Sequence, residues 1–308
     1  MKCNVNQSAF VNNSLKPILI DAWRLASTPW RIAAHSRARS NGTVPVAILF
    51  YHRVADDEPN DWTISCSDFQ DQVDWLSDNF DLVSLEEAQN RIRSGHNTKP
   101  TVSITFDDGY ADNSTFALPM LIQRKIPVTY FVTTYHTLQG EPFPHDVERG
   151  VPLPANCADT LRAMAGAGVE IGGHTRNHPS LGHITDPEQL FDEVITATRE
   201  MEEVIGKKIR YFAFPFGQLE NLNSEVFRLV KEHGFKGICS AYGGWNEIGD
   251  DGFHMQRIHG DPQMAFLKNW LTVDPRKRKV WQTEVVNQMI RKGLANTNDN
   301  DSATDSTQ

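Results

Sequence analysis

The sequence has few cysteines, no long apolar run and fewer basic than acidic residues. Its four cysteines, Cys3, Cys66, Cys157 and Cys239, are widely spaced and form no C-x-x-C pair, which argues against a disulfide framework and a thiolate zinc site. The longest nearly apolar stretch, residues 44–51, is far shorter than the ~18 residues of a membrane span. The 30 Lys and Arg against 39 Asp and Glu give a net charge of −9, so we expect no nucleic acid as a partner.

The amino-terminal residues also lack the apolar core of a secretory signal. The polar residues Asn4, Asn6, Gln7 and Ser8 occupy the place where that core would begin, which disfavours export by a cleaved signal. Unpaired cysteines fit a reducing compartment. We therefore expect a cytoplasmic protein, with association at the inner membrane surface as the alternative.

The 308 residues divide into three regions, 1–43, 44–295 and 296–308. Within the first, residues 16–39 mix apolar and basic side chains, which is typical of a peripheral membrane contact but also of a helix packed outside the main domain. Asp21 and Pro29 interrupt a continuous interfacial face. The last region contains only Asn, Thr, Asp, Ser, Ala and Gln, and we expect it to be disordered.

In the middle region, short β-branched runs alternate with segments of helical period, which predicts an α/β fold with a parallel sheet wrapped by helices. Ser84 with Glu87 predicts a helix start, as does Asp186 before Pro187. The proline-rich residues 135–156 are expected to form a loop at the rim of the active site. The predicted strands are residues 44–51, 101–106, 128–133, 169–172, 211–215 and 237–240.

Two clusters of candidate ligands follow predicted strands. Asp107 and Asp108 come directly after residues 101–106, and His174 and His178 come after residues 169–172. Each cluster has an ordinary structural reading, because Asp-Asp-Gly forms turns readily and histidine pairs are often structural. The carboxyl ends of parallel strands, however, meet at the rim where such folds place their active sites. We therefore expect the two clusters to lie together.

The residue types at this rim favour a divalent metal. Adjacent carboxylates repel each other unless they share a cation. Histidines four residues apart, such as His174 and His178, share a face on a helical turn and can meet one ion. Two imidazoles and one carboxylate leave a coordination position open for water, as in catalytic zinc sites, with manganese, iron or cobalt as alternatives. The second aspartate would then accept a proton from that water as a general base.

Three motifs in this order resemble the polysaccharide deacetylases of the NodB-homology group, carbohydrate esterase family 4. They are TFDDGY at residues 105–110, HTRNHP at 174–179 and FAFPFG at 212–217, and the resemblance covers residues 45–259, with FYHRV at 50–54 similar to some members.

The resemblance implies a distorted (β/α) barrel in which Asp108, His174 and His178 bind the metal and Asp107 is the general base. It also implies N-acetylated amino sugars of a glycan as the substrate, with acetate released. The backbone N–H of Phe216 would help to hold the oxyanion, and its ring would give the sugar an apolar wall.

The sequence departs from the family pattern at two places. Many members carry an arginine that orients the base where this chain has Ala213, and Arg210 need not reach Asp107. The late Leu-x-His motif that supplies the general acid is not plainly present. His259 is our candidate for that acid, and His52 is an equal rival for a role in the site.

Trp245 is a further candidate for substrate binding, against the alternative of a buried loop anchor. We thus expect a metal-dependent hydrolase that removes N-acetyl groups from a polysaccharide. The first alternative is the same scaffold acting on a lipid-linked sugar, an acetyl ester or a cyclic imide. The second is a glycan-binding homologue that has lost turnover, which the change at Ala213 and the missing acid motif would favour. The glycan, the oligomeric state and the pathway stay open.

Overall fold

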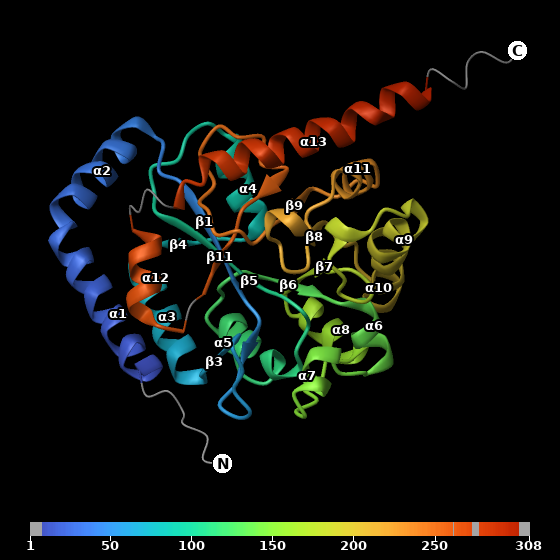
Figure 1. Ribbon diagram of the computed structural model, residues 1–308, viewed down its shortest axis with the longest axis horizontal. Coiled ribbons are helices and arrows are strands. Elements are labelled where there is room, and N and C mark those ends of the chain that lie inside the picture. Colours follow the sequence, from blue (N-terminus) through green and yellow to red (C-terminus); the bar gives the residue numbers. More distant parts are fainter. Residues whose placement is uncertain (1–7, 261, 273–276, 302–308) are drawn as a thin grey trace, which may run out of the picture.

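The computed structural model describes residues 8–260, 262–272 and 277–301, with 8–14 and 296–301 described as backbone only. An eight-strand path crosses the middle of the molecule and helices surround it (Figure 1). The strands are β1 (Val46–Tyr51), β2 (Arg53–Val54), β3 (Thr63–Ile64), β4 (Asp81–Leu82), β5 (Thr101–Phe106), β6 (Val128–Val132), β7 (Glu170–Gly173), β8 (Tyr211–Ala213), β9 (Gly237–Cys239), β10 (His254–Met255) and β11 (Ile258–His259).

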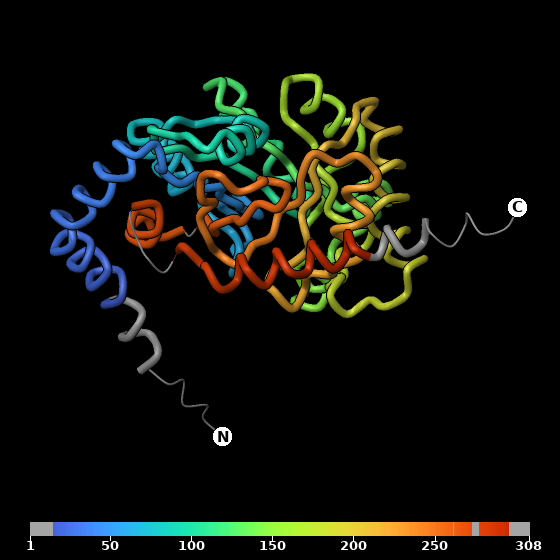
Figure 2. The backbone as a smooth tube through the Cα atoms, turned by 90° about the horizontal axis from the view of Figure 1, so that it is seen from above, coloured from blue at the N-terminus to red at the C-terminus, as the bar shows by residue number. Residues whose placement is uncertain are grey.

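The α-helices alternate with these strands along most of the chain. They are α1 (Ser8–Ala26), α2 (Thr28–Asn41), α3 (Cys66–Asn79), α4 (Leu85–Arg93), α5 (Ala117–Gln123), α6 (Thr134–Gln139), α7 (Pro144–Glu148), α8 (Ala158–Gly166), α9 (Pro187–Phe191), α10 (Ala197–Ile205), α11 (Ser224–Glu232), α12 (Met264–Leu271) and α13 (Val280–Asp301). In Figure 2, α1 and α2 form one side of the molecule with α12 beside them, and α13 runs along an edge.

The main sheet is parallel and curls into a distorted barrel. Its order is β10-β9-β8-β7-β6-β5-β1-β11, with β4 added to β5. The two ends of this order, β10 and β11, are separated in the chain by only Gln256 and Arg257. The edges of the sheet therefore approach each other where this short connection crosses the gap, which places Arg257 inside the barrel and leaves its side chain fully buried.

All six predicted strands are present, with bounds that shift by a few residues. The inner face and the helix α4 share an apolar cluster that includes Ile48, Phe131 and Tyr211. Arg210, directly before β8, forms an ion pair with Glu86 of α4. Since Arg210 precedes the strand, α4 lies at the amino-terminal ends of the strands and leaves their carboxyl ends free to carry a site.

The predicted helix starts at Ser84 and Asp186 are confirmed. The Ser84 hydroxyl accepts a hydrogen bond from the Glu87 amide at 3.1 Å, and the Asp186 carboxylate accepts one from the Glu188 amide at 3.0 Å. The second helix is not uniform, because a π-helical turn, Asp192–Thr196, separates α9 from α10. Turns of this kind often occur at functional sites.

Two other segments differ from their expected form. Residues 135–156 contain the short helices α6 and α7 rather than loop alone. The helix α13 continues to Asp301, so residues 296–301 extend it instead of being disordered, since adding a residue to a formed helix costs less than nucleating one. The rest of the predicted tail, 302–308, lies outside the described residues.

The amino-terminal region forms two helices that meet at Ser27. Pro29 lies in the first turn of α2, where proline is well tolerated because that N–H has no partner within the helix. In the part of the chain that the structure describes, no helix is long and apolar enough to cross a bilayer.

Candidate active site

The two predicted ligand clusters meet at the carboxyl ends of β5 and β7. Asp107 and Asp108 follow β5, and His174 follows β7. A φ of 71° at Asp108 and of 102° at Gly109 turn the chain sharply after the strand. Left-handed backbone is costly for residues other than glycine and tends to gather where function requires it. Four of the seven such residues in the described ranges lie at this rim: Asp108, Thr175, His178 and Phe216.

Asp108, His174 and His178 form a compact group of ligand atoms. The Asp108 Oδ1 atom lies 3.4 Å from His174 Nε2 and 3.1 Å from His178 Nε2. One ligand atom from each residue lies within 4.8 Å of the other two. This is the spacing at which three atoms can bind a common ion.

The chemistry of these donors fits a cation. His174 Nδ1 lies 2.8 Å from the carbonyl oxygen of Ala213, so in the neutral ring Nδ1 carries the proton and Nε2 presents a lone pair. That lone pair faces the Asp108 carboxylate, whose buried Oδ1 has no hydrogen-bond partner among the described residues. Two acceptors this close repel each other unless a cation or proton lies between them. The buried Asp-His-His group could therefore bind a metal.

The electrostatics of Asp108 favour its ionised form. Burial would raise its pKa, but positive charge and hydrogen-bond donation from His178 and His174, which act where a cation would otherwise lie, lower the pKa well below its ordinary value. A carboxylate that keeps its charge when buried is suited to hold a cation.

The histidines are brought together by an irregular loop and not by the helical turn that we expected. Thr175 and His178 both have positive φ angles, of 68° and 61°, and the His178 amide donates to the Thr175 hydroxyl at 2.9 Å. Buried Glu193, on the π-helical turn, accepts hydrogen bonds from the backbone amides of Arg176 and Asn177, each at 3.0 Å. The turn thus anchors the loop that presents His178.

Asp107 is held by Arg257, which the sequence analysis missed. The guanidinium donates to both carboxylate oxygens, with Nη1 2.6 Å from Oδ1 and Nη2 2.8 Å from Oδ2. It also lies over the rings of Phe50 and Phe131, 5.0 and 5.2 Å from their centroids. The signal was present in the motif Gln256-Arg257-Ile258-His259, where we considered only the histidine.

Arg257 explains how the chain tolerates Ala213 at the position where many relatives have an arginine. Ala213 is buried in β8, and Arg210 is occupied by Glu86 and Glu170. A guanidinium from the β10–β11 connection reaches Asp107 instead. The expectation that Arg210 need not reach Asp107 agrees with this arrangement.

His52 and His259 lie together at the ends of β1 and β11. Their ring centroids are 5.9 Å apart, and Phe50 pairs with His259 in the sheet. Burial lowers the pKa of His52, and burial with the nearby His52 lowers the pKa of His259 to about 4. Both imidazoles are therefore neutral near pH 7 in the protein. His52 Nδ1 is buried without a hydrogen-bond partner among the described residues.

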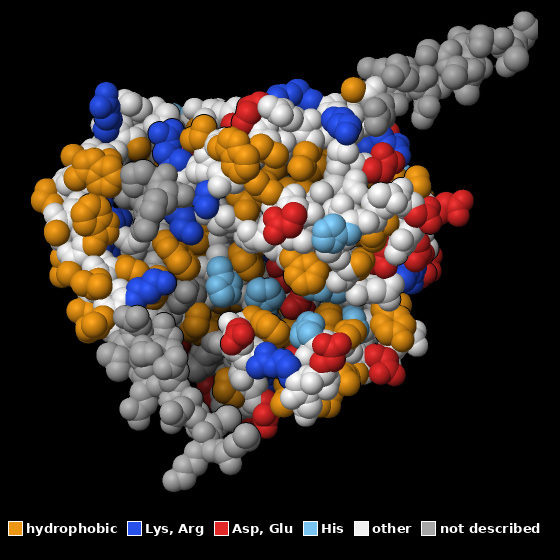
Figure 3. Space-filling view, viewed as in Figure 1, with side chains coloured by type: hydrophobic (Ala, Val, Ile, Leu, Met, Phe, Trp, Pro, Cys, Tyr) orange, Lys and Arg blue, Asp and Glu red, His pale blue; other side chains and the backbone are white. Residues whose placement is uncertain are grey.

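Phe216 is an exposed aromatic at the mouth of the site. Its side chain is 56% exposed, and its ring lies 4.9 Å from that of His178. Phe216 therefore does not belong to the apolar core. Phe143, from the 135–156 segment, also packs near His178, with their ring centroids 5.6 Å apart. Figure 3 shows histidines gathered at the centre of this face, with apolar side chains around them.

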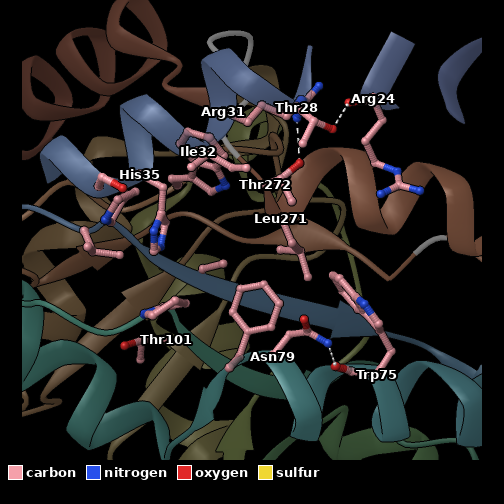
Figure 4. Close-up of a pocket in the computed structure, with 17 residues that line it drawn as sticks. Arg24, Thr28, Arg31, Ile32, His35, Trp75, Asn79, Thr101, Leu271 and Thr272 are labelled. Atoms are coloured by element: carbon pink, nitrogen blue, oxygen red, sulfur yellow. Dashed lines mark hydrogen bonds between the residues drawn. The ribbon is translucent and has the colours of Figure 1, made fainter. Parts of the chain in front are cut away.

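Trp245 does not lie in this site. It is buried, its indole N–H donates to the carbonyl of Trp270 at 3.1 Å, and its neighbour Asn246 pairs with Val46 at the opposite end of β1. The alternative of a buried loop anchor is therefore correct. Asn246 pairs with Val46 at the amino-terminal end of β1, so Trp245 lies at the end of the barrel opposite to Asp107. Trp245 lines a separate cavity of about 370 Å³ between α1–α2 and the barrel (Figure 4).

Fold and site together define a class: hydrolases built on a curled parallel (β/α) sheet with a buried Asp-His-His group at its carboxyl rim. Residues 94–238 match the family model for polysaccharide deacetylase. The chain is 25% identical over 224 residues to the Bacillus subtilis (strain 168) protein named "Putative polysaccharide deacetylase YxkH", covering 71% of this chain and 72% of the relative.

A second relative in the same strain, the peptidoglycan-N-acetylmuramic acid deacetylase PdaA, is 27% identical over 135 residues, covering 44% of each chain. Among solved structures, the Streptococcus pyogenes deacetylase PplD in complex with acetate matches with a TM-score of 0.61 and 19% identity, covering 74% of this chain and 98% of that one. IcaB from Ammonifex degensii matches with a TM-score of 0.61 and 22% identity, covering 74% and 97%.

Residues 94–238 thus form a polysaccharide deacetylase domain, and such domains belong to hydrolases acting on carbon–nitrogen bonds other than peptide bonds. The distorted barrel expected from the resemblance is confirmed.

Proposed function

We propose that this protein removes N-acetyl groups from the amino sugars of a glycan in a metal-dependent reaction. The observation that carries the proposal is the buried Asp108-His174-His178 group beside an aspartate held by an arginine. Asp108, His174 and His178 would hold a divalent ion, for which zinc suits the nitrogen and oxygen ligands best. Such an ion polarises the amide carbonyl and lowers the pKa of bound water toward ~7.

Asp107 would accept the proton of the attacking water. Both of its oxygens accept from Arg257, but a carboxylate offers about four lone-pair directions, so acceptor capacity toward the site remains. Arg257 fixes the carboxylate in one orientation, and the surrounding Phe50 and Phe131 exclude water from the pair. Fixed geometry of this kind lowers the barrier to proton transfer.

His259 would be the general acid only after gaining a proton, since its ring is neutral near pH 7 in the free protein. It would take up the proton that Asp107 removes from water and pass it to the leaving amine, and His52, its neighbour, would orient it or the substrate. The amide N–H of Phe216 would stabilise the oxyanion, and the exposed Phe216 ring would stack on a sugar. One relative is named for N-acetylmuramic acid of peptidoglycan, which supports an N-acetylated wall glycan as the first substrate to test.

The alternative of a glycan-binding homologue without turnover loses its main support. That alternative rested on Ala213 in place of the base-orienting arginine and on the missing acid motif. Arg257 supplies the missing guanidinium from another strand connection and so removes the first of these supports.

The test combines metal content with acetate release from N-acetylglucosamine oligomers. Asp107→Asn should retain zinc and lose acetate release, whereas His174→Ala and His178→Ala should lose both. His96→Ala, at an exposed position, is the control and should match the unchanged protein. A His174→Ala or His178→Ala protein with full zinc content and activity would overturn the ligand assignment. An unchanged protein that is loaded with zinc and binds the oligomers but releases no acetate would overturn the activity.

A further inference from the structure

The helices α1 and α2 carry an apolar surface that points away from the rest of the molecule. Of the twelve large hydrophobic side chains that are exposed within the described residues, seven lie on these two helices. The orange side chains along the left edge of Figure 3 show this surface. Six of these seven form what we call the outer face: Leu15, Ile18, Leu19, Trp23, Leu25 and Trp30. The seventh, Ile32, also borders the cavity beneath the helices.

The opposite side of the same helices is polar and faces the protein. Asp21, Arg24, Thr28, Arg31 and His35 recur at intervals of three or four residues and are buried or half-buried. This is the reverse of an ordinary surface helix, whose apolar stripe packs on the core.

Specific hydrogen bonds fix this orientation. Buried Arg31 donates to the Thr272 hydroxyl and to the Asn269 side-chain oxygen, both at 2.6 Å, and so ties α2 to the end of α12. Arg24, Thr28, Arg31 and His35 also line the cavity of about 370 Å³ beneath the helices (Figure 4). The helices cannot rotate their apolar side inward without breaking the Arg31 contacts.

The charge around the outer face is opposite to that of the whole chain. Residues 15–41 contain five basic side chains and one acidic side chain, whereas the chain carries −9. Three of the basic residues, Lys16, Arg37 and Arg39, are exposed. An apolar helical face with tryptophans, bordered by Lys and Arg, is typical of helices that lie in the interface of a membrane with anionic lipids.

We propose that the outer face docks this protein on an anionic phospholipid bilayer, with α1 and α2 lying in the plane of the interface. A second copy fits less well, because a symmetric dimer through this face would bring two cationic clusters together. The histidines of the active site appear at the centre of the view in Figure 3, away from the outer face at its edge. Docking at that edge therefore leaves the site open to a glycan at the membrane surface.

The experiment measures cosedimentation of the full chain with lipid vesicles of phosphatidylcholine alone and of phosphatidylcholine mixed equally with phosphatidylglycerol. We expect binding to the mixed vesicles that weakens with salt. Trp23→Ala and Leu19→Ala should each lower the partition coefficient about tenfold. The pair Arg37→Gln and Arg39→Gln should lower it about thirtyfold on the anionic vesicles and little on the neutral ones. Acetate release from a soluble oligomer should not change in any of these variants.

Trp281→Ala is the matched control, because Trp281 is 67% exposed and Trp23 59%, but Trp281 lies on α13. This control should bind vesicles like the unchanged protein. Failure to bind the anionic vesicles would overturn the proposal, as would equal losses in Trp23→Ala and Trp281→Ala. A dimer in sedimentation velocity that Trp23→Ala dissociates, without vesicle binding, would assign the outer face to a second copy instead. These outcomes do not depend on whether the site releases acetate.

Discussion

Arg257 and Asp107 form a bidentate, fully buried ion pair inside the barrel, although 150 residues separate them in the chain. The arginine lies in the two-residue connection between β10 and β11, the point at which the two edges of the sheet come closest. A buried ion pair of this kind contributes little to the net stability of the fold. Removing one partner is nevertheless costly, because the charge of the other partner stays buried without compensation. Its position next to the ligand group makes it a positioning contact for the proposed base.

Replacing Arg257 should therefore reduce turnover more than substrate binding. Arg257→Lys keeps a charge but loses the two parallel hydrogen bonds, and we expect kcat to fall about a hundredfold with KM changed little. Zinc content should stay unchanged, because Arg257 contacts none of the three ligands' donor atoms in the described residues. Steady-state kinetics on N-acetylglucosamine oligomers and metal analysis check both expectations.

Arg257→Met provides the comparison that separates positioning from folding. It leaves Asp107 buried without its partner, which costs about 3–5 kcal/mol, so a lower melting temperature is expected along with loss of activity. If Arg257→Lys melted normally and kept full kcat, the positioning role would be wrong.

Glu193 should control metal affinity without touching the metal. It accepts hydrogen bonds from the Arg176 and Asn177 amides and so supports the loop that ends in His178. Glu193→Gln puts an NH₂ group opposite N–H donors, and we expect zinc affinity to fall about 10- to 100-fold. Competition with a chelator measures this change.

Glu200→Gln is the control for that variant. Glu200 pairs with the side chain of Arg176 at the surface and, within the described residues, forms no hydrogen bond with the loop backbone. Its loss should change zinc affinity less than twofold or so, since exposed ion pairs contribute only about 0–1 kcal/mol. Equal effects of the two substitutions would show that the charge of the region matters and not the anchoring of the loop.

Gly217→Ala should destabilise the turn that carries Phe216. Gly217 has a φ of 61°, and a Cβ atom there would lie 2.5 Å from the backbone nitrogen of Ala241. Gly150→Ala is the matched control, because Gly150 has a similar φ of 77° but an added Cβ atom would meet no atom within 4 Å. This substitution should lower the free energy of unfolding by only about 1–2 kcal/mol. Thermal unfolding of both variants should show the larger loss for Gly217→Ala. A larger loss of stability in Gly150→Ala would contradict the close packing of Gly217 against Ala241.

His254 should make the folded state sensitive to acid. Burial lowers the pKa of His254 to about 3, and its Nε2 lies 2.8 Å from the Ser240 hydroxyl. In the unfolded chain the imidazole of His254 has an ordinary pKa of ~6.5, so it takes up a proton at a pH where the folded chain keeps it neutral. The stability from the neutral ring is therefore complete above that pH and is lost as the pH falls toward 3.

The measurement compares unfolding free energies of the unchanged protein and His254→Gln across pH. The advantage of the unchanged protein should shrink by about 2 kcal/mol between pH ~8 and pH ~5. His96→Gln, at an exposed position, should show no such trend. A constant difference between the unchanged protein and His254→Gln would mean that His254 is protonated in the folded state as well.

The sequence by itself determined the strands, two helix starts and the candidate ligand residues. These features depend on local chemistry: β-branched runs favour strands, Ser84 and Asp186 satisfy amides of the first turn, and motif residues follow strand ends. Parallel strands then bring their carboxyl ends to one rim, so Asp108 could be expected near His174 and His178 without coordinates.

Only the tertiary structure decided which partner orients Asp107, where Trp245 lies and which side of α1 and α2 faces outward. Each of these depends on contacts between residues far apart in the chain. Arg257 reaches Asp107 because the sheet curls until β10 and β11 approach each other, and periodicity in the sequence does not report that curvature. The helical pattern of residues 16–39 likewise predicted two faces, but the contacts of Arg31 with α12 determined which face the protein covers.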